Sequence, residues 1–303
     1  MPSILEEKYT VDKFDKKKEA FFNRFGWDFM PFAQKDPLPD SELLVPHQKG
    51  EVQELIDLVK EGDLVSFITS RIGMGKTALS KFLSRALPEE DEDIVTVFLH
   101  GPSIETREQM LRLVLENLEL HSEKGDVASE FEQLRTWHQN YPDFLLVIIV
   151  DEFPDISKNA LEIVRSVADL EGIVWIVNGV KNDLMSFVRD NAPALMERKR
   201  FVLELDPLEL EEARELLLYR MAWAKGGEYE DRSIEPFTDD AIEKIHEKSD
   251  GVPRRILKLA GDAVYNAIER DELKITEELV REREEEEKEE GKAFWSFLPF
   301  LQD

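Results

Sequence analysis

The chain is 303 residues long, and its 66 acidic side chains outnumber 39 basic ones, for a formal net charge of −27. This charge excludes any overall electrostatic attraction to nucleic acid or anionic lipid, although local basic clusters could still bind either. The absence of cysteine excludes disulfides and thiolate zinc sites. With 42% hydrophobic residues, the chain can form the core of one large or two small domains.

The N-terminal part of the chain contains two contrasting segments. Residues 1–24 are charged and helix-prone, which predicts a solvated helical leader. Residues 25–32, Phe-Gly-Trp-Asp-Phe-Met-Pro-Phe, are too aromatic for a linker, so we expect them to pack on the domain that follows. The chain begins without the apolar core of a signal peptide, and no apolar run approaches the roughly 20 residues of a membrane helix. We therefore expect a cytoplasmic protein without a membrane span.

Apolar stretches alternate with helical patterns in the middle of the chain. The apolar stretches predict five strands, at residues 64–68, 94–99, 144–150, 173–177 and 201–205. The periodic stretches predict helices at 48–61, from 78 to a stop at Pro88, and at 105–120, 126–139, 158–170 and 182–197. Such alternation predicts a parallel sheet with its ligand at the carboxyl edge.

From residue 206 onward the pattern is wholly helical. The predicted helices, at 208–225, from a Thr238 cap to 249, and at 253–270, indicate a small second domain over residues 206–273. Residues 274–303 form an acidic helix or tail with an apolar end, Phe294–Leu301. That end either folds back on the body or docks on a partner, and both alternatives remain open.

A phosphate-binding loop joins the first predicted strand to its helix. Glycines let backbone N–H groups converge on an anion, and the helix N-terminus adds partial positive charge. Lys76 can reach the β- and γ-phosphates of ATP, and the Thr77 hydroxyl can ligate Mg²⁺. The pattern usually begins with glycine, where this chain has Ser70. The predicted nucleotide-binding residues are Ser70, Arg71, Ile72, Gly73, Met74, Gly75, Lys76, Thr77 and Ala78.

Polar residues at the ends of two later strands complete a set for ATP hydrolysis. Asp151 follows the third strand and can hold the magnesium shell together with Thr77, while Glu152 can polarise the attacking water. Asn178 ends the fourth strand and can orient that water with its amide. The alternative interpretation is two surface acids at a strand end and a turn asparagine before Gly179; the phosphate loop argues against the first of these.

These motifs resemble those of the AAA+ ATPases, and the likeness covers about residues 25–270. It includes the phosphate loop, the Asp151–Glu152 pair, Asn178 as sensor 1, and Gly-Val-Pro-Arg at 251–254 as sensor 2. The nearest likeness is to secretion ATPases of the ExeA type, transposition ATPases of the MuB and TniB type, and archaeal origin-recognition initiators. The resemblance implies a P-loop NTPase three-layer α/β sandwich over residues 25–205, with a five-stranded parallel sheet of order 5-1-4-3-2, and a C-terminal helical lid over 206–273.

The resemblance also implies further site residues. Val45 and Pro46 would line the adenine pocket, and Arg254 would touch the γ-phosphate within the same subunit. An arginine just before the fifth strand would act on the neighbour's nucleotide; Arg200 is the first choice and Arg198 the second, with ordinary surface cations as the alternative. The expected partners are therefore ATP or ADP and further copies of the chain or another AAA+ protein.

Three functions remain open from the sequence. The first is an ATP-hydrolysing switch that self-associates and acts on DNA, as in replication or transposition. The second is a protein-remodelling or adaptor ATPase that docks on a protein complex through its apolar C-terminal segment. The third is a nucleotide-binding scaffold with little hydrolysis, against which the full catalytic set argues. Net charge favours a protein partner, whereas the family likeness favours DNA.

Overall fold

The computed structural model describes residues 12–33, 38–62, 65–120, 126–167, 170, 172–227 and 233–281. They belong to two compact units: an α/β unit, residues 37–206, and a helical unit built from residues 1–36 and 207–303. In the described part of the chain, no helix is long and apolar enough to cross a membrane. The first residues of the expected leader and most of the expected acidic tail, including Phe294–Leu301, lie outside the described residues.

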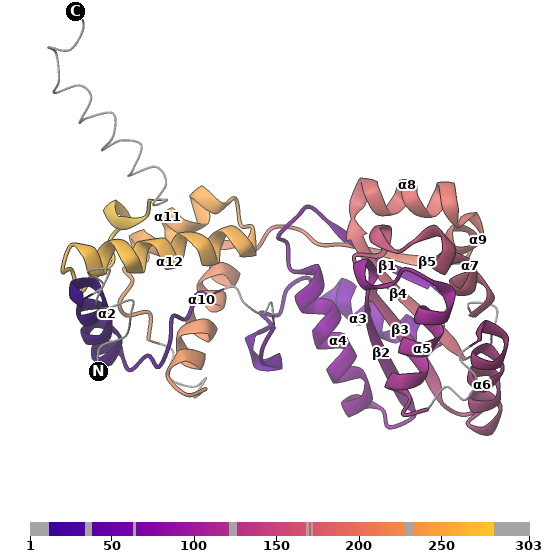
Figure 1. The fold of residues 1–303 in the computed structure, drawn as a ribbon. Coiled ribbons are helices and arrows are strands. Elements are labelled where there is room, and N and C mark those ends of the chain that lie inside the picture. Colours follow the sequence, from indigo (N-terminus) through magenta and orange to yellow (C-terminus); the bar gives the residue numbers. More distant parts are fainter. Residues whose placement is uncertain are drawn as a thin grey trace, which may run out of the picture. The chain divides into compact units, whose positions relative to one another are not determined.

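A five-stranded parallel sheet forms the centre of the α/β unit (Figure 1), and its spatial order is β2-β3-β4-β1-β5. The predicted order is therefore confirmed. The three inner strands are almost wholly buried, whereas the edge strands β2 and β5 are partly exposed, which explains why residues 144–150 are continuously apolar. The strands are β1 (Val65–Ser70), β2 (Ile94–His100), β3 (Leu145–Asp151), β4 (Ile173–Val180) and β5 (Lys199–Glu204).

Helices cover both faces of this sheet, which gives the predicted three layers (Figure 1). One face carries α3 (Lys49–Lys60) and α4 (Lys76–Glu90). The other carries α5 (Arg107–Asn117), α6 (Val127–Asn140), α7 (Lys158–Val167), α8 (Lys181–Asn191) and α9 (Pro193–Glu197). Because strand side chains alternate between faces, β3 and β4 direct Ile148 and Trp175 into the hydrophobic core on one face and Asp151 and Asn178 toward α4 on the other.

The predicted stop of the second helix at Pro88 is wrong, since α4 continues to Glu90. A proline within a helix leaves the carbonyl four residues earlier without its N–H donor, and here that carbonyl belongs to Ser84. The Thr96 hydroxyl of β2 donates to the Ser84 carbonyl at 2.6 Å. The sheet therefore supplies the missing hydrogen bond, and the helix is not forced to end.

The helical unit contains α2 (Asp12–Phe25), α10 (Leu210–Ala224), α11 (Asp239–Ser249) and α12 (Pro253–Glu269). The sequence predicts the start of α11 well, because the Thr238 hydroxyl accepts from the Ala241 N–H at 3.2 Å. Helix α10 has buried residues along its whole length, including leucines 216–218, so other elements of the unit cover it on several sides.

The expectation that residues 25–32 pack on the nucleotide domain is wrong, because this aromatic segment lies within the helical unit. The Phe32 ring meets Phe237 edge-on at 5.7 Å between centroids, and Phe29 meets Trp223 at 4.5 Å. Local composition shows that these rings need burial, but their partners come from the far end of the chain. The α/β unit accordingly begins near residue 37 rather than 25.

Gly251, between α11 and α12, provides a test of packing in the helical unit. Its φ is +66°, and a Cβ there would lie 2.4 Å from the Leu208 carbonyl oxygen. We expect Gly251→Ala to lower the free energy of unfolding by about 2–3 kcal/mol, through steric overlap and left-handed strain. Urea denaturation followed by circular dichroism measures this change.

Gly261→Ala, in α12 of the same unit, is the matched control. A Cβ at Gly261 would make only an ordinary contact, 3.7 Å from the Phe32 Cβ. Because alanine favours helix over glycine, this variant should match or exceed wild-type stability. Equal stability of the two variants would contradict the close approach at Gly251.

Candidate active site

The loop between β1 and α4 has the backbone of an anion site. Gly73 and Gly75 have φ values of +84° and +93°, in the left-handed region that strains other residues. Gly75 is the N-cap of α4 and has no side chain that could cap the helix, so the first N–H groups of α4 remain for a ligand. A Cβ at Gly75 would meet nothing within 4 Å, so conformation rather than crowding requires this glycine.

Lys76 is hydrogen bonded at the base of this loop. Its Nζ donates to the Ser70 hydroxyl at 3.0 Å and to the Arg71 carbonyl at 3.1 Å. The Ser70 hydroxyl donates to the same carbonyl at 2.7 Å. The serine that replaces the usual glycine is thus buried, and its oxygen accepts from the lysine. Of the other predicted loop residues, Met74 is buried and Ile72 is exposed. The rest are half-buried: Gly73, Gly75, Thr77 and Ala78.

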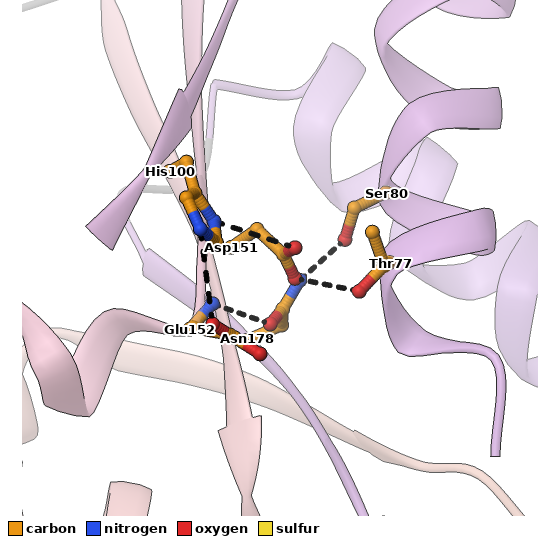
Figure 2. Close-up of polar contacts among 6 residues, drawn as sticks. All are labelled: Thr77, Ser80, His100, Asp151, Glu152 and Asn178. Atoms are coloured by element: carbon orange, nitrogen blue, oxygen red, sulfur yellow. Dashed lines mark hydrogen bonds and ion pairs between the residues drawn. The ribbon is translucent and has the colours of Figure 1, made fainter. Parts of the chain in front are cut away.

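Thr77 and Asp151 bring two oxygen ligands together. The Thr77 hydroxyl, in the first turn of α4, donates to Asp151 Oδ1 at 3.1 Å (Figure 2). Asp151 is the last residue of β3 and is 3% exposed. Hydroxyl and carboxylate oxygens are the donors that Mg²⁺ prefers, so this pair fits a metal ion shared with nucleotide phosphates. Within the described residues, no group of three or more acidic or histidine side chains forms a separate metal site.

Asn178 holds the backbone of Glu152. Its Oδ1 accepts from the Glu152 N–H at 3.0 Å, and its Nδ2 donates to the Ser80 hydroxyl at 2.8 Å (Figure 2). Asn178 lies within β4 rather than at its end, since the strand continues to Val180. Glu152 has a φ of +52°, and its side chain is 54% exposed. The expected water-orienting role of Asn178 remains a prediction; what the structure shows is a contact to the Glu152 backbone.

His100 belongs to the same cluster, although it is not among the site residues predicted from the sequence. It is the last residue of β2 and is paired in register with Asp151 of β3. Its Nδ1 lies 4.0 Å from Asp151 Oδ2, and its Nε2 lies 3.9 Å from Glu152 Oε2 (Figure 2). A signal was present: a polar residue ends the second strand, at the edge where the ligand was expected.

The turn after His100 packs directly on the acid pair. A Cβ at Gly101 would lie 2.3 Å from the Glu152 carbonyl oxygen and 3.0 Å from that of Asp151. No side chain can occupy such a space without moving the backbone. Gly101 therefore helps to fix the position of Glu152.

Arg198 and Arg200 lie at the amino ends of the strands, whereas the phosphate loop lies at their carboxyl ends. Lys199, between them, pairs with Val65 at the start of β1, whereas the loop follows Ser70 at its end. Strands rise about 3.3 Å per residue, so β1 alone separates the two sites by about 17 Å. Neither arginine backbone is near the phosphate loop of its own unit.

The other predicted nucleotide contacts are in two different units. Val45 is buried and Pro46 exposed, between the short helix Ser41–Leu43 and α3 of the α/β unit. Arg254 is an exposed residue in the first turn of α12, in the helical unit. Its predicted contact with a γ-phosphate, and those of Val45 and Pro46 with adenine, remain predictions.

Sequence comparison matches part of the chain to a known family. Residues 59–185 match the family described as AAA domain. This stretch, less than half of the chain, is similar to AAA domains. It is similar to an uncharacterized HTH-type transcriptional regulator of Methanocaldococcus jannaschii, with 31% identity over 147 residues, 46% of this chain and 35% of that protein. It is also similar to general secretion pathway protein A of Aeromonas hydrophila, with 25% identity over 268 residues, 83% of this chain and 45% of that protein. The chain thus spans less than half the length of either relative.

Solved structures share the fold of this chain. The ORC2 protein of Aeropyrum pernix, in ADPNP–ADP complexes, has a TM-score of 0.63 and 19% identity, covering 84% of this chain and 70% of that chain. The ORC1 protein of the same organism, in complex with DNA, has a TM-score of 0.58 and 20% identity, covering 80% and 66%. At such identities the likeness concerns fold alone. The predicted P-loop fold and the likeness to the origin-recognition and ExeA-type AAA+ proteins are confirmed.

The contact at Gly101 of the AAA+ domain can be tested by substitution. We expect Gly101→Ala to displace the Glu152 backbone and to lower the free energy of unfolding by about 1–3 kcal/mol. Gly50→Ala is the control, because a Cβ at Gly50 in α3 would meet nothing within 4 Å. It should be neutral or slightly stabilising in chemical denaturation. If Gly101→Ala were as stable as Gly50→Ala, the packing of this turn on the acid pair would be refuted.

Proposed function

We propose that this AAA+ protein binds ATP with Mg²⁺, hydrolyses it, and acts as a nucleotide-driven switch. The observation that carries the proposal is the Thr77–Asp151 hydrogen bond, which joins the end of the phosphate loop to the acidic end of β3. Bound Mg²⁺ would be held by these two side chains and would neutralise charge on the transferred phosphoryl group.

Each remaining residue then has a chemical task. Lys76 and the N–H groups at the start of α4 bind the phosphates, and Val45 and Pro46 contact adenine. Glu152 is well placed as the base that polarises water, because its side chain is half exposed while its backbone is held by Asn178.

Two sets of arginines supply positive charge to the transition state. Arg254 comes from the helical unit of the same chain. Arg200, or Arg198 as the second choice, comes from a neighbouring copy. The sheet supports a role for Arg200 or Arg198 in a neighbouring copy, because the start of β5 lies at the amino ends of the strands, away from the chain's own phosphate loop. Such an arrangement requires a homo-oligomer or an AAA+ partner in the active state.

Two substitutions separate binding from turnover. Lys76→Ala should abolish nucleotide binding, measured by titration calorimetry, because the phosphates lose their main cation. Glu152→Gln should keep ATP bound but lower the rate of phosphate release at least about 100-fold, because a neutral amide cannot act as the base. Tight ATP binding by Lys76→Ala would contradict the loop assignment. Bound ATP without turnover in the wild-type protein would instead favour the nucleotide-binding scaffold.

DNA is the partner that we favour for the switch. The support is the shared fold with ORC1, which was solved with DNA, and the similarity to an HTH-type regulator. The second candidate is a protein complex, which the net charge of −27 favours, with residues 294–301 as the docking segment. Both candidates use the same ATPase cycle and differ only in what the switch binds.

A DNA-binding assay separates these two candidates. We expect the Glu152→Gln variant with ATP to bind a fluorescein-labelled duplex in anisotropy measurements at low salt. The affinity should fall steeply as salt rises, because phosphate contacts release counterions. Lys76→Ala provides the nucleotide-free control. No binding at low salt with ATP would remove DNA and leave the protein partner.

A further inference from the structure

Helix α4 touches the sheet at two successive polar side chains. Thr77 and Ser80 are three residues apart, so they lie on the same face of the helix. The first donates to Asp151 of β3, and the second accepts from Asn178 of the adjacent strand β4 (Figure 2). The nucleotide-binding motif includes Thr77, whereas Ser80 lies beyond it.

Ser80 is a buried polar residue with a specific hydrogen-bond partner. It is 0% exposed and lies on a helix whose other buried side chains are Leu79, Leu83 and Leu87. A hydroxyl costs free energy to bury unless it is hydrogen bonded. The bond to Asn178 at 2.8 Å offsets this cost.

The hydrogen-bond pattern also fixes which way the Asn178 amide points. A backbone N–H can only donate, so the group that faces Glu152 must be the amide oxygen. The amide nitrogen then faces Ser80, whose hydroxyl oxygen accepts. With Ser80 removed, the NH₂ group of Asn178, which is only 1% exposed, would lose this acceptor.

We propose that Ser80 is a positioning residue for ATP hydrolysis, which orients Asn178 and through it the backbone of Glu152. The proposal rests on the proposed ATPase function. Thr77 and Ser80 then connect the phosphate-binding helix to the metal ligand on β3 and to the support of the base on β4. A shift of α4 is transmitted to Glu152 through this chain of hydrogen bonds.

A double-mutant cycle tests the proposal in the full chain. Ser80→Ala should lower kcat roughly tenfold, the effect of one lost hydrogen bond, while the ATP dissociation constant changes less than about twofold. Ser80→Ala combined with Asn178→Ala should be no slower than Asn178→Ala alone, because both act through the same contact. Ser80→Thr, which keeps the hydroxyl, should restore most of the rate.

Ser84→Ala is the matched control. It lies one turn further along α4, and its hydroxyl donates to the Lys81 carbonyl of its own helix at 2.8 Å. This variant should leave kcat unchanged. Equal losses of kcat in Ser80→Ala and Ser84→Ala would overturn the proposal. So would a double variant whose loss of kcat equals the product of the two single losses.

Hydrogen exchange separates this inference from the proposed function. In protein without nucleotide, the Glu152 amide should exchange roughly tenfold faster in Ser80→Ala than in wild type, and no faster in the double variant than in Asn178→Ala. This measurement needs no hydrolysis. If the wild-type protein did not hydrolyse ATP, the ATPase proposal would be refuted, but the exchange rate of the Glu152 amide would still test the hydrogen bonds from Ser80 to Glu152. An unchanged exchange rate in Ser80→Ala would refute the role of Ser80.

Discussion

The geometry of the site depends on one hydrogen bond, between the Thr77 hydroxyl and Asp151. It exists because β1 and β3 flank β4 in a parallel sheet, so their carboxyl ends lie on either side of the end of β4. Helix α4 leaves β1 and passes over β4 and β3 toward β2. Thr77 in its first turn donates to Asp151 of β3, and Ser80, the next polar side chain facing the sheet, accepts from Asn178 of β4. One crossover connection brings the loop, the acid pair and the asparagine together.

The parts of this site that the sequence predicts are those encoded locally. The phosphate loop is contiguous, and Asp151 is recognisable because it ends a long apolar run. The sheet order came from the family resemblance, since alternating strands and helices do not by themselves determine which strands are neighbours. For His100 the sequence shows only that a polar residue ends the second strand, because its nearness to Asp151 depends on the lateral register of β2 against β3. The contact of Gly101 with Glu152 depends on the same register. A register of this kind has no signature within a single strand.

The helical unit shows the same limit at larger scale. Its aromatic contacts join residues from both ends of the chain: buried Phe32 lies against buried Phe237, and half-buried Phe14 stacks on Tyr265. The hydrophobic pattern of residues 25–32 indicates burial. Because the hydrophobic effect is not directional, the pattern does not specify which residues pack against this segment. The sequence pattern favours domains made of contiguous segments. In the structure, the α/β unit is instead inserted in the sequence between the two parts of one helical unit.

Net charge and local charge act over different distances, which explains how so acidic a chain can present an anion site. At physiological salt, the field of distant surface charges is screened over about 8 Å. In the proposed site, the loop N–H groups and Lys76 would act on a phosphate at hydrogen-bonding distance, with about half a positive charge from the start of α4. A formal charge of −27 therefore lowers the association rate of an anion more than it weakens the binding of an anion already in the loop. The same reasoning applies to DNA: the number of cations on the contacting surface, rather than the total charge, determines binding.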